Sequence, residues 1–141
     1  MNLVRRLGIG AAALVAAGLS ATGFAHADPV VIPFQIAPAA FGNPNGSFDV
    51  PPIGCVVILG EHPGTAVITG GKEGGWGCLV SGNIQWLNLT TGTTGAAQLS
   101  DGLHGFPPRA VIEPGPGQIA LVLTSVSGGT ITPGFATFSV G

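Results

Sequence analysis

Short runs of alternating hydrophobic and polar residues recur along the chain after residue 27, and Gly, Pro, Asn or Asp separates each run from the next. No stretch there keeps a 3.6-residue apolar period over three turns, so the pattern predicts strands. The expected strands lie at 30–36, 55–59, 65–69, 77–81, 84–90, 95–100, 110–113, 118–125 and 134–140. Nine short strands in so small a chain favour a sandwich or a barrel.

Several connectors have the residues of defined turns. Asn43-Pro44-Asn45-Gly46 combines a fixed φ with a residue that accepts a positive one. Ser81-Gly82-Asn83 and Thr91-Gly92 are short enough to be hairpin links. Together these two links predict a three-stranded meander over residues 77–100.

Residues 118–123 are apolar in both of their alternating sets. A central strand covered on both sides has this pattern, and so has a strand with one face that meets a partner. Two packed sheets therefore fit better than one open sheet. Residues 34–52 are rich in Pro, Gly and Asn and predict an irregular crossover, in which Phe41 and Phe48 would cap one end of the core.

We therefore expect an all-β fold, a small immunoglobulin-like β-sandwich of about 7–9 short strands. The likeness to immunoglobulin domains is architectural, because such a domain places its tryptophan between the two cysteines, whereas Trp86 follows both of them. Trp86 lies in an alternating apolar strand. We expect it to pack in the core rather than to stack on a ligand.

The first 27 residues have the pattern of a cleavable signal peptide. Arg5 and Arg6 precede an uncharged apolar run over residues 7–19, and Ala25-His26-Ala27 supplies the small residues of a cleavage site. The apolar run has 13 residues, whereas a membrane span needs about 20, so an uncleaved anchor is the weaker alternative. The pattern predicts cleavage after Ala27.

The mature chain is expected to be a single all-β domain over residues 28–141, of which 28–52 form the first strand and the crossover. Its apolar stretches are shorter than ten residues, so we expect no transmembrane helix in it. These features predict a protein that is secreted or associated with the cell envelope.

The only two cysteines, Cys55 and Cys78, lie in the mature part. Export would place them in an oxidising compartment, and no third thiol competes for pairing. We therefore expect a disulfide between them. Its closed loop of 24 residues would stabilise the fold by about 3.5 kcal/mol.

Charged side chains are scarce. The mature part has two basic and six acidic residues, a formal charge of −4, and cannot neutralise a run of phosphates, which excludes nucleic acid as a partner. Charged residues make up about 7% of it, against a usual figure of about 25%. Such a surface is covered by Thr, Ser, Gly and Asn, or else by another protein or lipid, which leaves an envelope-associated oligomeric β protein as an alternative.

Few side chains could perform catalysis, and the chain has no Gly-x-Ser-x-Gly motif. Glu61-His62 and Asp101-Gly102-Leu103-His104 each put a carboxylate and an imidazole in a Gly-rich turn, and together they could bind a metal ion. Neither has the helical i,i+4 His pair of a metalloprotease. We therefore predict no catalytic residue, no cofactor and no metal site. A small secreted hydrolase or metal-dependent enzyme using His62 or His104 is the alternative.

Two segments of the second half carry a familiar pattern. Residues 83–95 contain Trp86 and the turn Asn88-Leu89-Thr90-Thr91-Gly92, and residues 134–140 have the sequence Gly-Phe-Ala-Thr-Phe-Ser-Val. They resemble small secreted β proteins of actinobacteria, which carry a tryptophan, an Asn-x-Thr-Thr-Gly turn and a closing Gly-x-x-x-Phe-x-Val strand. The resemblance implies a β fold and export, and it implies no activity.

The sequence therefore predicts an exported non-enzymatic β-sandwich that acts at or outside the cell surface by binding or by assembly. Its ligand is left open, and its partner would be a protein or another component of the envelope. The choice between a monomer and a homo-oligomer is also left open.

Overall fold

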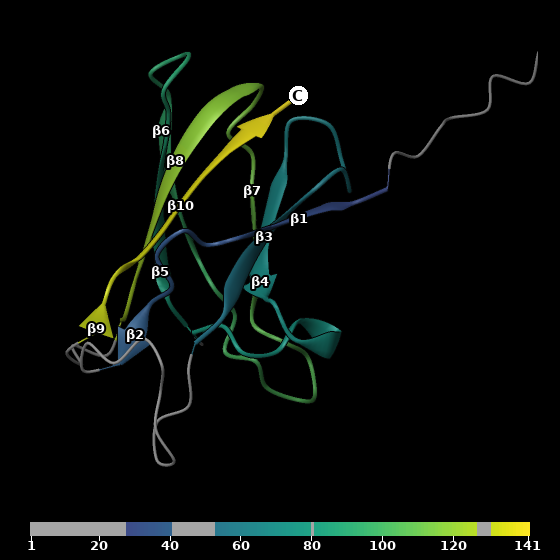
Figure 1. Cartoon of the computed structure of the whole chain (residues 1–141), viewed down its shortest axis with the longest axis vertical. Helices are drawn as coiled ribbons and strands as arrows, with labels where there is room; N and C mark the ends of the chain where they lie inside the picture. The colour runs from purple at the N-terminus through teal and green to yellow at the C-terminus, as the bar shows by residue number, and fades with distance from the viewer. Residues whose placement is uncertain (1–27, 41–52, 80, 127–130) are drawn as a thin grey trace, which may run out of the picture.

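The computed structural model describes residues 28–40, 53–79, 81–126 and 131–141, which form two packed antiparallel sheets (Figure 1). Sheet A contains, in spatial order, β1 (Val30–Pro33), β3 (Cys55–Leu59), β4 (Ala66–Gly70) and β7 (Arg109–Ile112). Sheet B contains, in spatial order, β10 (Gly134–Val140), β8 (Gly117–Thr124), β5 (Asn83–Asn88) and β6 (Thr94–Gln98). The predicted all-β sandwich is confirmed.

Shorter elements complete the described part of the chain. Strands β2 (Ala39–Ala40) and β9 (Ile131–Thr132) form a separate antiparallel pair, and η1 (Glu73–Gly75) is a single 3₁₀ turn after β4. Among the described residues, no helix has the length and hydrophobicity of a membrane span.

The hydrophobic core lies between the two sheets and follows from the alternating pattern of the strands. Val57 of β3 and Ile68 of β4 are fully buried on the inner face of sheet A. Ile119, Leu121 and Leu123 of β8 are fully buried on the inner face of sheet B. Because successive side chains of a strand point to opposite faces, the residues between them point outward. Of these, Val56 and Val67 are also buried, whereas Val122 is 36% exposed.

The chain passes from sheet A to sheet B directly after β1. The backbone N–H of Phe34 still donates to Cys55 of sheet A, whereas Ile36 forms an isolated bridge with Phe135 of β10. Between them, the side-chain oxygen of Gln35 accepts a hydrogen bond from the backbone N–H of Thr137. This segment therefore covers part of the outer edge of sheet B, where an unpaired strand edge would be open to pairing with other chains.

The disulfide between Cys55 and Cys78 is confirmed, with an S–S distance of 2.02 Å. It joins the first residue of β3 to the loop that follows η1. Beside it, the N–H of Gly54 donates to the carbonyl oxygen of Gly77. Residues 77–79 therefore lie against the start of sheet A.

This placement shows why the strand predicted at 77–81 is wrong. Residues 77–79 and 81 are not in a strand. The Gly54 hydrogen bond and the disulfide hold Gly77 and Cys78 against the start of β3 instead of beside β5. The second neighbour of β5 is β8, so the predicted three-stranded meander is also wrong. Ser81-Gly82-Asn83 is no hairpin link, because the N–H of Ser81 donates to Ser100 across the sheet.

The other predicted strands are present. Those at 55–59 and 134–140 agree with β3 and β10 at both ends, and the remaining ones differ from the observed strands by a few residues. The two-residue strands β2 and β9 were not predicted. Phe41, Phe48 and the turn predicted at residues 43–46 lie outside the described residues.

Candidate functional site

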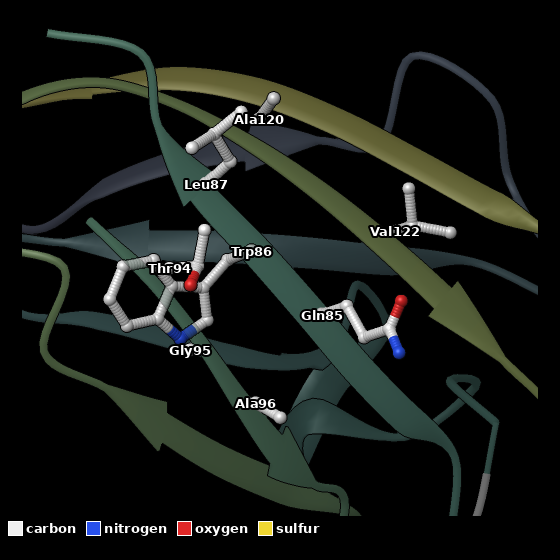
Figure 2. A pocket seen from close by; sticks show the side chains of 8 residues that line it. All are labelled: Gln85, Trp86, Leu87, Thr94, Gly95, Ala96, Ala120 and Val122. Atoms are coloured by element: carbon white, nitrogen blue, oxygen red, sulfur yellow. The ribbon is translucent and has the colours of Figure 1, made fainter. Parts of the chain in front are cut away.

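A groove of about 600 Å³ lies on the outer face of sheet B (Figure 2). Three adjacent strands, β5, β6 and β8, supply its walls and floor. We call it the sheet B groove, and it is lined by Gln85, Trp86, Leu87, Thr94, Gly95, Ala96, Ala120 and Val122.

The strand register explains why this face is hollow. Leu87 lies opposite Ala120 on one side and Thr94 on the other. The next outward residue of β5, Gln85, has Ala96 as its neighbour in β6. The long side chains of β5 are thus flanked by short ones, which leaves space beside them along the face of the sheet.

Trp86 belongs to the inward set of β5 and packs against the core, as predicted. Its cross-strand partner is Gly95, and a Cβ at that position would overlap the indole. The indole therefore lies against the bare backbone of Gly95, as Figure 2 shows. Both residues also line the groove, so Trp86 stands between the core and the groove.

The face that carries the groove has no charge. None of the four strands of sheet B contains an acidic, basic or histidine residue. The polar side chains in the groove are the amide of Gln85 and the hydroxyl of Thr94. A charged ligand would lose its hydration there without an opposite charge in return, so the groove suits an uncharged ligand with apolar surface.

The acidic and histidine residues singled out in the sequence lie in loops, and none of them lines this groove. Glu61 forms an exposed ion pair with Arg109, with 2.8 Å between the carboxylate oxygen and the guanidinium nitrogen. The backbone oxygen of His62 accepts hydrogen bonds from both the N–H and the hydroxyl of Thr65.

The second of these loops is organised by its own hydrogen bonds. A side-chain oxygen of Asp101 accepts from the N–H of Leu103, and His104 follows with a positive φ of 59°. Within the described residues, no three His, Cys, Asp or Glu side chains are close enough together to hold a metal ion. The structure thus does not bring the two loops together as a metal site.

The residue that sequence reasoning missed is Asn88. Its side chain is fully buried and makes four hydrogen bonds: Nδ2 donates to the carbonyl oxygens of Pro114 and Pro116, and Oδ1 accepts from the N–H groups of Thr90 and Thr91. These bonds, of 2.9 to 3.1 Å, tie the β5–β6 turn to the β7–β8 loop. The Asn-x-Thr-Thr-Gly segment is therefore a structural element of this fold.

The signal that could have identified Asn88 is its place in the alternating pattern. It follows Ile84 and Trp86 at even spacing in the inward set of β5, so a polar side chain there has to find partners inside.

Comparisons of the chain with protein-family models, with curated proteins and with solved structures found no match. The resemblance to small secreted actinobacterial proteins stays a prediction.

Proposed function

We propose that the protein is an exported, non-enzymatic binding domain that holds an uncharged, mainly apolar ligand in the sheet B groove. The observation that carries the proposal is a hollow of about 600 Å³ on a sheet without charged residues. Small-molecule sites usually have volumes of about 300–1,000 Å³, with mostly apolar linings and a few polar groups.

The lining residues have distinct roles in this proposal. Leu87 and Val122 are each 36% exposed, and a ligand would cover their apolar surface, which favours binding. The Gln85 amide and the Thr94 hydroxyl are positioned to hydrogen bond with a polar group of the ligand and so to fix its orientation.

The groove supports binding rather than catalysis. None of its eight lining residues has a carboxylate, imidazole, thiol or amine. The Thr94 hydroxyl is the one potential nucleophile among them, and no general base or acid in the groove would activate it or transfer a proton.

The place of action, at or outside the cell surface, is supported by two features of the chain. A disulfide is a feature of oxidising compartments, and the pattern of residues 1–27 is that of a signal peptide. We expect the exported protein to begin at Asp28. Amino-terminal sequencing of the exported protein tests this, and a product that still begins at Met1 would contradict it.

Binding in the groove is tested with Nile red, an uncharged apolar dye that fluoresces more strongly in apolar surroundings. Val122→Glu places a carboxylate in the groove, and Val111→Glu is the matched control, since Val111 is 44% exposed on the outer face of sheet A. We expect the wild type and Val111→Glu to bind the dye with the same affinity, and Val122→Glu to bind at least tenfold more weakly.

Two results would contradict the proposal: no dye binding by the wild type, or equal binding by both variants. The solution mass of the same three proteins distinguishes binding from assembly. An oligomer that Val122→Glu alone dissociates would show that the groove face meets a second copy of the chain instead of a small ligand.

A further inference from the structure

Three large apolar side chains are exposed together at the end of the sandwich that holds the disulfide. Trp76 is 41% exposed, Leu103 57% and Phe106 72%. They come from two loops, the one between β4 and β5, which contains η1, and the one between β6 and β7. We call these three residues the apolar tip.

The β6–β7 loop holds two of them at a tight turn. The N–H of Phe106 donates to the carbonyl oxygen of Leu103, and the two residues between them, His104 and Gly105, have φ values of 59° and 79°. Positive φ at both central positions defines a type I′ turn. Leu103 and Phe106 are the first and fourth residues of this regular, hydrogen-bonded turn.

The two loops lie side by side, as Figure 1 shows below sheet A. The hydroxyl oxygen of Thr69 is within hydrogen-bond distance of the carbonyl oxygens of both Gly75 and Pro108, at 3.2 and 2.7 Å. A Cβ on Gly75 would lie 3.1 Å from the ring of Pro107. The loop of Trp76 is thus held next to the loop of Leu103 and Phe106.

We propose that the apolar tip inserts into the interfacial region of a lipid bilayer. Its three side chains expose together roughly 300 Å² of apolar surface, whereas a stable protein interface buries about 800 Å² on each partner. A bilayer needs no complementary surface and accepts side chains that project from loops. Tryptophan is also enriched at the headgroup level of membrane proteins, where its ring meets both water and hydrocarbon.

The charges around the tip indicate which kind of lipid surface it fits. In the two loops, Lys72 is accompanied by the acidic residues Glu73 and Asp101. This excess of negative charge gives no attraction to anionic lipids. The binding should therefore occur on zwitterionic membranes and change little with salt, because it depends on apolar contact.

The test uses the mature protein and vesicles of phosphatidylcholine in a flotation assay at low and high salt. The tip variant combines Leu103→Ser with Phe106→Ser, and Val111→Ser is the matched control on the outer face of sheet A. We expect the wild type and the control to float with the vesicles, and the tip variant to partition at least tenfold less. Val122→Glu should still bind vesicles, which separates this surface from the groove.

A direct readout comes from tryptophan fluorescence. Vesicles should shift the emission of the wild type to shorter wavelength, and Trp76→Phe should remove most of this shift. Absence of vesicle binding by the wild type, or equal partition of the wild type and the tip variant, would overturn the proposal. So would a dimer of the wild type that the tip variant dissociates, with no vesicle binding, because the tip would then be a protein interface.

Discussion

The two ends of the sandwich connect their strands by different means. At one end, the buried side chain of Asn88 joins two turns through four hydrogen bonds. At the other end, the Cys55–Cys78 disulfide and the adjacent backbone hydrogen bonds hold the loop after η1 against sheet A.

Both ends leave apolar side chains exposed, Leu89 (56%) at the Asn88 end and three at the disulfide end, but their loops are held differently. At the Asn88 end, backbone groups of both turns are buried beside the Asn88 amide, since a buried amide must have its hydrogen-bond partners. The disulfide end is held by a covalent bond, by backbone hydrogen bonds and by hydrogen bonds of the Thr69 and Asp101 side chains. None of these uses the side chains of the apolar tip. Trp76, Leu103 and Phe106 are exposed there, so we expect their replacement to change the stability little.

The largest effect is expected from removing the covalent connection. Cys55→Ala combined with Cys78→Ala should lower the free energy of unfolding by about 2 to 5 kcal/mol, because the unfolded chain regains the entropy of an open loop. Urea unfolding without reductant measures it. An unchanged midpoint, or two free thiols in the native wild type, would show that packing alone holds this end.

The Asn88 end is tested by Asn88→Ala. The substitution leaves two carbonyl oxygens and two N–H groups without their partners, and it should lower the free energy of unfolding by about 2 to 4 kcal/mol. Asn83→Ala is the matched control, since Asn83 is exposed in the same strand, and its effect should stay within about 0.5 kcal/mol. Equal stability of the two variants would remove the contrast between the ends.

Two glycines measure how tightly the Asn88 end is packed. Gly115 and Gly117 both have positive φ values, 70° and 137°, so alanine is strained at either position. A Cβ at Gly115 meets nothing within 4 Å, whereas one at Gly117 would lie 2.6 Å from the Asn88 Oδ1 atom. In thermal unfolding, we expect Gly117→Ala to destabilise by about 1 to 2 kcal/mol more than Gly115→Ala. Equal melting temperatures would indicate that the loop around Asn88 shifts to make room for the added Cβ.

The smallest effect is expected at the apolar tip. Phe106→Ser should change the free energy of unfolding by no more than about 0.5 kcal/mol, because a side chain that is 72% exposed has little packing to lose. The same urea unfolding measures it, with Phe138→Ser as the contrast, since Phe138 is 4% exposed in the core. A loss above about 1 kcal/mol for Phe106→Ser would mean that the disulfide end depends on its side chains after all.

Much of the strand content followed from the sequence, because its signals are local. β3 is a run of β-branched and apolar residues that ends at Leu59, directly before Gly60, whose φ is 95°. β10 alternates regularly between Pro133 and the last residue. In both strands the side-chain pattern and the breakers agree, so both bounds were predicted correctly.

The predicted hairpin link at Thr91-Gly92 is confirmed, since β5 and β6 pair across it, but the pairing of strands distant in sequence did not follow, because it depends on packing. The turn residues around Gly82 suggested a local hairpin, yet β5 pairs with β8, which lies more than twenty residues further along the chain. The sheet B groove was not predicted for the same reason, because it depends on which strands pair. The apolar outward set of β8 was visible in the sequence, but only the register brings Ala120 and Val122 beside the side chains of β5.

The burial of Asn88 has a consequence for how the protein can be produced. Asn88-Leu89-Thr90 is an acceptor sequence for N-linked glycosylation, and the sugar would be attached to the same Nδ2 atom that donates to Pro114 and Pro116. A glycan could reach this atom only before the two turns meet. It would then replace a donor hydrogen and prevent that end from closing. In a eukaryotic secretory pathway, glycosylation at Asn88 would therefore mark molecules that cannot fold, whereas bacterial export, which does not use this acceptor sequence, avoids the conflict.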